Sequence, residues 1–138
     1  MIVNQQYSHI AETVLQASEF KFYYTGSKFF GGMTEKSDID FFTQDSKEVR
    51  KFLEDNGFSL DESNSYSEKG CSAVYEYYSH PRIHVQVVGG VNIKIDAQNL
   101  LLASGVRMSS IPKISRRYVW DVAIGLAWAK VQSHPALV

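Results

Sequence analysis

Two short segments of alternating side chains, joined through a glycine turn, constrain this chain most. Residues 20–24 alternate aromatic with other side chains, which predicts a β-strand ending at the turn Gly26-Ser27. A second alternating segment, DIDFFT, begins at Asp38, ten residues after that turn. Because side chains two residues apart on a strand share one face, Asp38 and Asp40 should project together while the apolar residues between them enter a core.

The rest of the chain predicts helices separated by further strands. Helical spacing of apolar residues indicates helices over 4–18, 47–56, 91–104 and 115–131. Alternation indicates strands over 58–60, 73–78 and 82–88, and the last two read as a hairpin. This order predicts an α/β, or α+β, fold: a small mixed β-sheet with helices packed mainly on one face.

Three local features refine these boundaries. Asp45 and Glu48 have the spacing of a capping box, which should begin the second helix. The hairpin is expected to turn at residues 79–81, around Pro81. The last helix is expected to bury one stripe of side chains, formed by Tyr118, Val122, Leu126 and Ala129.

Length and composition bound the class of protein. The 138 residues suit a single domain over 1–138, with a core at about 20–95 and C-terminal helices at about 92–132. Apolar residues make up 44% of the chain, which excludes a disordered or collagen-like protein. No apolar run approaches the ~18 residues of a membrane span, so no membrane partner is expected. The single cysteine, Cys71, and the absence of a signal-like start indicate a cytoplasmic protein.

Charge is divided unevenly along the chain, although the net charge is only −1. Residues 1–104 carry nine Lys and Arg against fourteen Asp and Glu, a net of −5. Residues 105–138 carry five basic residues against one acidic residue, a net of +4. The basic end either faces a phosphate-bearing partner or forms a solvated helix face that balances the acidic body.

The turn and the paired carboxylates together indicate phosphate and metal chemistry. Gly26 lets backbone N–H groups approach an anion closely, and Ser27 adds a hydroxyl donor. Lys28 follows directly and is either a phosphate contact or a solvated lysine. Asp38 and Asp40, on one strand face beside this cradle, suit Mg²⁺, which commonly binds one or two carboxylates plus substrate phosphates. The pattern predicts a nucleoside triphosphate site for metal-assisted transfer.

In this order and spacing, Gly26-Ser27 followed by Asp38-x-Asp40 resembles the DNA polymerase β-like nucleotidyltransferase superfamily, and its small bacterial and phage-type members look closest. The resemblance covers about residues 20–95. It implies that Gly26 and Ser27 hold the β- and γ-phosphates and that Asp38 and Asp40 bind Mg²⁺. It further implies transfer of a nucleoside monophosphate, AMP from ATP by family analogy, to a hydroxyl group.

The sequence departs from this family at the third carboxylate, which members usually carry on a later strand. In the strand over 82–88, His84 stands where the resemblance places an aspartate, and Gln86 shares its face. Histidine is a poor ligand for Mg²⁺ and suits Zn²⁺ or, less well, Mn²⁺. Neutral His84 is also suited to act as a general base. Slow or altered catalysis, a changed metal and a nucleotide-binding pseudoenzyme therefore all remain open.

Other residues are candidates for auxiliary roles at the same site. Glu76, on the neighbouring strand, is either a substitute carboxylate or an exposed edge residue. Arg116 and Arg117 are candidates for binding the triphosphate or a polyanionic acceptor.

Two functions are consistent with these features. The first is a metal-dependent nucleotidyltransferase whose acceptor is a protein or an RNA. The second is a catalytically impaired protein of the same fold that binds a nucleotide or a protein, as an inhibitor or an antitoxin-like module. The replaced third carboxylate favours the second function, while the intact Gly26, Ser27, Asp38 and Asp40 favour the first.

Overall fold

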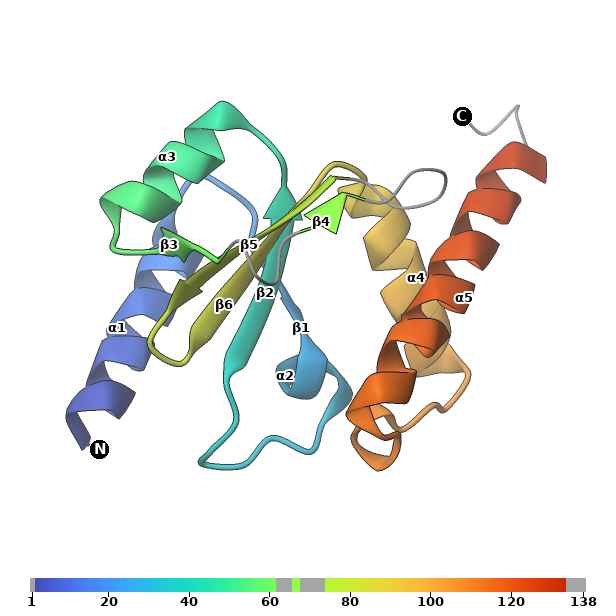
Figure 1. Ribbon diagram of the computed structural model, residues 1–138, viewed down its shortest axis with the longest axis horizontal. Coiled ribbons are helices and arrows are strands. Elements are labelled where there is room, and N and C mark those ends of the chain that lie inside the picture. Colours follow the sequence, from blue (N-terminus) through green and yellow to red (C-terminus); the bar gives the residue numbers. More distant parts are fainter. Residues whose placement is uncertain (1, 62–65, 68–73, 134–138) are drawn as a thin grey trace.

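A computed structural model describes residues 2–61, 66–67 and 74–133 of the chain (Figure 1). The five α-helices and one 3₁₀ turn of the described residues are α1 (Ile2–Ala17), α2 (Gly26–Phe30), α3 (Lys47–Asp55), α4 (Val91–Ala103), η2 (Met108–Ser110) and α5 (Lys113–Ser133). The strands are β1 (Tyr23–Thr25), β2 (Ile39–Gln44), β3 (Ser59–Leu60), β4 (Tyr66–Ser67), β5 (Val74–His80) and β6 (Ile83–Val88).

The strands form one mixed sheet, which confirms the predicted fold class. The strand order is β1-β2-β6-β5-β3, and β4 pairs with β5 beside β3. Only the central pair, β2 and β6, is parallel, and the other pairs are antiparallel. The parallel pair needs a long crossover, which α3 and the strands β3 to β5 supply. β6 therefore lies in the middle of the sheet, with β2 on one side and β5 on the other.

One face of the sheet packs against α1 and α3. Phe41 from β2 and Val85 from β6 are fully buried there, together with Leu15 of α1 and Leu53 of α3. Phe22 adds an edge-to-face contact with Phe41, with ring centroids 6.3 Å apart. Burying aliphatic and aromatic side chains of this size contributes roughly 1.5–3 kcal/mol each, so this cluster fixes how the sheet sits on its helices.

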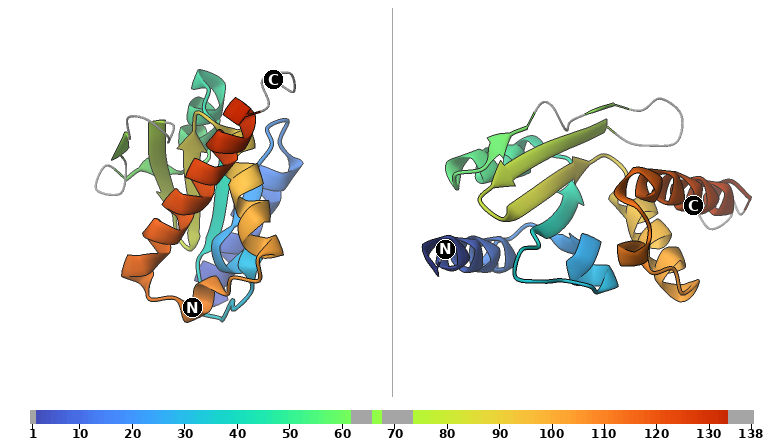
Figure 2. Two further views of the ribbon diagram at one scale, coloured as in Figure 1. Left: turned by 90° about the vertical axis from the view of Figure 1, so that its right-hand side faces the viewer. Right: turned by 60° about the horizontal axis from the view of Figure 1, so that its bottom comes forward.

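The opposite face of the sheet is approached by α4, with α5 lying alongside it (Figure 2). The buried amide of Gln98 on α4 donates a hydrogen bond of 2.9 Å to the carbonyl oxygen of Tyr24 in β1. Lys94, one turn earlier, lies over the ring of Phe42, which points away from the first core. Helices therefore lie on both faces, whereas the sequence indicated mainly one.

The predicted inner stripe of α5 is wrong. Tyr118, Val122 and Leu126 are 69%, 64% and 54% exposed, while Ala123 is only 2% exposed. Ala123 and Ala127 instead pack against Ala97 and Leu101 of α4 in a second core. The prediction followed the large apolar side chains. Small residues allow two helix backbones to approach closely, so α5 turns its alanines inward. Among the described residues, no helix is long and apolar enough to cross a membrane.

Two predicted boundaries also shift. Ser46, and not Asp45, caps α3, because its hydroxyl accepts a 3.1 Å hydrogen bond from the Val49 N–H. Asp45 forms an ion pair of 2.9 Å with Arg50. The hairpin turn is tighter than expected, since His80 pairs with Ile83 and only two residues connect the strands. Pro81 fixes a negative φ at the first of these positions, and the φ of 66° at Arg82, the second, is the pattern of a type II turn.

The face that α5 buries can be tested by substitution. Ala123→Leu should lower the free energy of unfolding by about 1–3 kcal/mol, because the added atoms have no room between α4 and α5. Leu126→Ala should change it by no more than about 0.5 kcal/mol, because that side chain is exposed. Urea denaturation of both variants checks this. A larger loss for Leu126→Ala than for Ala123→Leu would contradict the packing described here.

Candidate functional site

The register of three strands aligns the residues that the sequence singled out. Asp40 of β2 lies opposite Thr25 at the end of β1 and opposite His84 of β6. Thr25 leads directly into Gly26 and the short helix α2. The sheet therefore places the glycine turn, the carboxylate and the imidazole in one row.

His84 lies against both carboxylates. Its Nδ1 is 3.4 Å from Oδ1 of Asp40 and 3.9 Å from Oδ2 of Asp38. The hydrogen bond to Asp40 raises the pKa of His84 above its ordinary value, burial opposes this, and the charges of Asp38, Asp40 and Asp61 add to it. The imidazole thus faces the aspartate pair, at the position where the family resemblance implies a third carboxylate. Asp61, which follows β3, was not anticipated from the sequence.

Gly26 is required by the closeness of Asp40. Its φ is +61°, and a Cβ placed on it would lie 2.6 Å from Oδ2 of Asp40. No side chain fits in that space, so the backbone of the turn and the carboxylate share one wall of the site. This close approach is what an anion cradle beside a metal-binding carboxylate needs.

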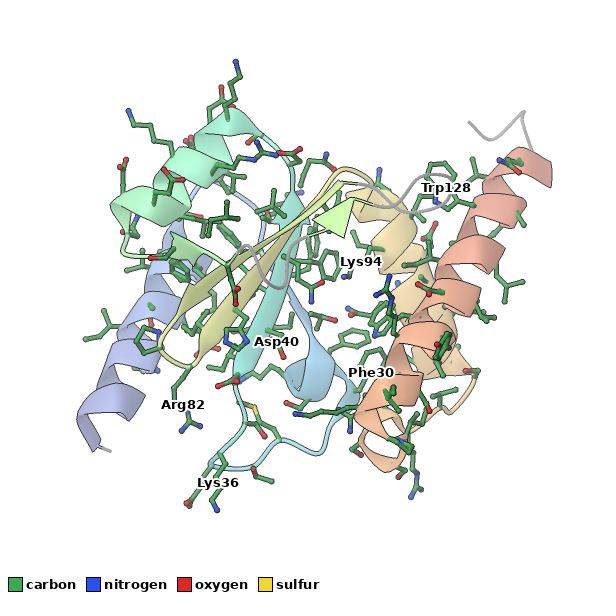
Figure 3. All side chains as sticks on the ribbon, viewed as in Figure 1. Phe30, Lys36, Asp40, Arg82, Lys94 and Trp128 are labelled. Atoms are coloured by element: carbon green, nitrogen blue, oxygen red, sulfur yellow. The ribbon has the colours of Figure 1, made fainter. Side chains whose placement is uncertain are left out.

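A cavity of about 650 Å³ opens in front of this wall. It is lined by four of the five predicted phosphate and metal residues, Gly26, Ser27, Asp38 and Asp40, and by His84. Across the cavity it is bordered by side chains from the loop after α2 and from α5, among them the cations Lys36, Lys113 and Arg116. Figure 3 shows Asp40 in the middle of the sheet and Lys36 out on the loop. The site therefore combines two carboxylates with basic groups, which suits a polyphosphate that carries a divalent cation.

The loop over residues 31–38 is tied to the hairpin turn. The guanidinium of Arg82 donates to the carbonyl oxygen of Ser37 at 2.9 Å and also to that of Glu35. At the other end of the loop, Gly32 lies so close to Ser109 that an added Cβ would be 2.9 Å from its Cβ. These contacts fix the outer wall of the cavity.

A second, smaller cavity of about 320 Å³ lies on the other side of Asp40. It shares Gly26, Asp40 and Trp120 with the first cavity. Its further lining is polar or charged at five positions, Thr25, Gln86, Lys94, Arg117 and Asp121. Gln86 and Arg117 were auxiliary candidates from the sequence, and the structure places both here rather than in the larger cavity.

Lys94 is the main site residue that the sequence did not reveal. Its ammonium group is close to Oε1 of Gln86 and lies 5.2 Å from the ring centre of Trp120. Burial lowers its pKa to about 8, although the charge of Asp40 opposes this shift. A lysine in an amphipathic helix is normally solvated, and only the docking of α4 on Phe42 buries this one.

Two other candidates are not placed in the larger cavity. Lys28 does not line it, and its Nζ lies 3.8 Å from Oε2 of Glu12 on α1. Glu76 pairs with Val87 in the β5–β6 register, not with His84 or Gln86. The side chain of Glu76 lies outside the described residues. Arg116, by contrast, lines the larger cavity and anchors itself by donating to the Ile111 carbonyl oxygen at 2.8 Å.

The donor set fits a magnesium ion that arrives with a nucleotide. Within the described part of the chain, no group of three or more His, Cys, Asp or Glu side chains is arranged to hold a metal ion by itself. Asp38 and Asp40 supply two carboxylates on one wall, and Mg²⁺ is commonly held by one or two carboxylates plus substrate phosphates. At Gly26 the backbone lies so close to Asp40 that a Cβ would be 2.6 Å from its Oδ2, so the backbone of the turn adjoins this carboxylate directly.

No family model, curated protein or solved structure matches this chain.

The steric role of Gly26 gives a stability prediction. Gly105→Ala should cost about 1–2 kcal/mol, because Gly105 has a φ of +76° but nothing within 4 Å of an added Cβ. Gly26→Ala should cost about 1–3 kcal/mol more, because the new methyl group must also displace the Asp40 carboxylate. In an Asp40→Ala background this extra cost should disappear, as a double-mutant cycle measured by urea denaturation will show. Equal costs in both backgrounds would contradict the close approach.

Proposed function

We propose that this protein is a metal-dependent nucleotidyltransferase that moves a nucleoside monophosphate, AMP from ATP, to a hydroxyl group on a protein or an RNA. The observation that supports it most is the shared wall of the larger cavity, where the Gly26-Ser27 turn, Asp38 and Asp40 meet. The resemblance to the DNA polymerase β-like nucleotidyltransferases assigns these residues to phosphate and metal binding.

The chain's own residues would act in distinct ways. Backbone and hydroxyl donors at Gly26 and Ser27 bind terminal phosphate oxygens, and the basic groups of Lys113 and Arg116 offset their charge from across the cavity. Mg²⁺, or Mn²⁺, held by Asp38 and Asp40 would supply Lewis-acid stabilisation of charge on the phosphates. The site thus orients the triphosphate with its leaving group toward the basic wall.

His84 is placed to receive the proton of an acceptor hydroxyl. It lines the same cavity and is oriented by its contact with Asp40. Only neutral imidazole accepts a proton, and the raised pKa of His84 reduces the neutral fraction near pH 7. Transfer by this route should therefore be slower than with a carboxylate at the same position.

The contact between His84 and Asp40 also favours a second function. The hydrogen bond between His84 and Asp40 occupies one carboxylate of the pair, which weakens its hold on a metal ion. The alternative is a catalytically impaired protein that binds a nucleotide or a protein partner, as an inhibitor or an antitoxin-like module.

Removing both aspartates tests the proposal. In the Asp38→Ala/Asp40→Ala variant, transfer of label from α-labelled ATP to acceptors in a cell lysate should fall to background, because no carboxylates remain to hold Mg²⁺. Isothermal titration with ATP, CTP, GTP and UTP, with Mg²⁺ or Mn²⁺, measures nucleotide binding in parallel. A labelled band sensitive to protease or to ribonuclease identifies the acceptor class.

The matched control is Glu54→Ala/Asp55→Ala, two exposed carboxylates at the end of α3. It should label acceptors as the unaltered protein does. Nucleotide binding without any labelled acceptor would support the catalytically impaired protein instead. If none of the four nucleotides binds, both functions are contradicted.

The identity of residue 84 separates the two functions. His84→Asp should raise transfer with Mg²⁺ by roughly 10-fold or more, because a carboxylate replaces a poor Mg²⁺ ligand at the aspartate pair. Initial rates of label transfer with Mg²⁺ and with Mn²⁺ measure the gain, which should be smaller with Mn²⁺ because Mn²⁺ tolerates imidazole better. An unchanged or lower rate with Mg²⁺ would refute the idea that His84 occupies a ligand position.

A further inference from the structure

Lys94 is held in an unusual position for a lysine on a surface helix. It lies near the start of α4, and its side chain lies between this helix and the sheet (Figure 3). Its Nζ is 5.3 Å from the ring centre of Phe42 and 5.2 Å from that of Trp120, and it contacts the Gln86 side chain. The side chain is thus enclosed by elements of the sheet, α4 and α5.

The surroundings of Lys94 connect it with the phosphate cradle. It lines the smaller cavity, whose wall includes Gly26 and Asp40. The same two residues line the larger cavity, where Lys36, Lys113 and Arg116 lie on the opposite wall. Lys94 therefore reaches the Gly26–Asp40 wall from the smaller cavity, whereas Lys36, Lys113 and Arg116 line the larger one.

We propose that the side-chain amine of Lys94 is itself an acceptor, so that the protein nucleotidylates its own Lys94 with a nucleoside triphosphate. This inference rests on the proposed function, because it uses the same phosphate cradle and the same divalent cation. It adds a covalent modification site, and the ligand class of the smaller cavity becomes the nucleoside monophosphate attached to Lys94.

The step balances with the nucleoside triphosphate as the only co-reactant. The lone pair of the neutral amine attacks the α-phosphorus, and a P–N bond forms. The bond between the α-phosphorus and the oxygen that bridges to the β-phosphate breaks, and pyrophosphate leaves with that electron pair. The nitrogen loses one proton to solvent, and the product is a phosphoramidate on Lys94. Nothing is oxidised or reduced.

The environment of Lys94 favours the neutral amine that this attack requires. Its pKa of about 8 leaves roughly one amine in ten neutral at pH 7, compared with fewer than about one in a thousand for an ordinary lysine. An amine in this state needs no general base to attack, unlike a hydroxyl.

The first test is self-labelling of the purified full chain. Incubation with α-labelled ATP and Mg²⁺ or Mn²⁺ should add one nucleoside monophosphate to the intact mass, and peptide mapping should place it on Lys94. The label should be lost in mild acid and survive alkali, as expected for a phosphoramidate. Lys94→Arg should abolish it, while Lys51→Arg, an exposed lysine of α3, should keep it.

A second readout needs no transfer. Acetylation of the unaltered protein, followed residue by residue with mass spectrometry, should show Lys94 reacting with a midpoint near pH 8. The α,β-methylene analogue of ATP, whose α-phosphorus cannot be released from the β-phosphate, should, when added with Mg²⁺, slow acetylation of Lys94 several-fold and leave Lys51 unchanged. This measurement uses no variant, so a folding defect in Lys94→Arg would not obscure the result.

The outcomes separate this inference from the proposed function. Label on a serine, threonine or tyrosine would overturn the inference, as would ATP binding with no label on the protein and no protection of Lys94. If lysate acceptors are still labelled in that case, the proposed function stands. Absence of nucleotide binding would overturn both.

Discussion

The structure depends on holding two like charges together on one strand face. Asp38 and Asp40 repel each other, and partial burial strengthens that repulsion because less water screens it. Positive or hydrogen-bond-donating groups on several sides reduce this repulsion. His84 lies against both carboxylates, Lys94 lies near Asp40, and basic side chains line the larger cavity. The parallel β2–β6 pair makes this arrangement possible, because it fixes Asp40 and His84 side by side. A divalent cation would relieve the same repulsion more completely than the imidazole does.

Much of this site could be predicted from the sequence because it lies on strands. Alternation assigns each strand residue to one of two faces, and the family resemblance indicated that the strand carrying His84 faces the aspartate pair. Gly26 was also singled out, because glycine lets backbone N–H groups approach an anion, but its close approach to Asp40 was not predicted. The remaining carboxylate, Asp61, lies just past a two-residue edge strand, where alternation is too short to give a reliable direction.

The helical part of the site was much less predictable, for a physical reason. The position of a helix residue depends on which face the helix turns inward, and α5 has apolar residues on more than one face. Large exposed side chains such as Tyr118 and Leu126 suggested the wrong face, while Ala123 and Ala127 make the close contact with α4. That rotation also brings Trp120 to the cavities and encloses Lys94. A wrong prediction of the face that α5 turns inward therefore leaves Trp120 and Lys94 out of the predicted site.

The hydrogen bonds of Arg82 have a consequence for the order of folding. The loop over residues 31–38 forms one wall of the larger cavity, yet two of its carbonyl groups are held by a side chain more than forty residues farther along the chain. That guanidinium reaches its place only after the β5–β6 hairpin has formed and β6 has paired with β2. Bringing together two parts of the chain this far apart costs conformational entropy, and the contacts between them form only afterwards. The loop therefore settles late in folding, and the mouth of the cavity takes its final shape only when the sheet is complete.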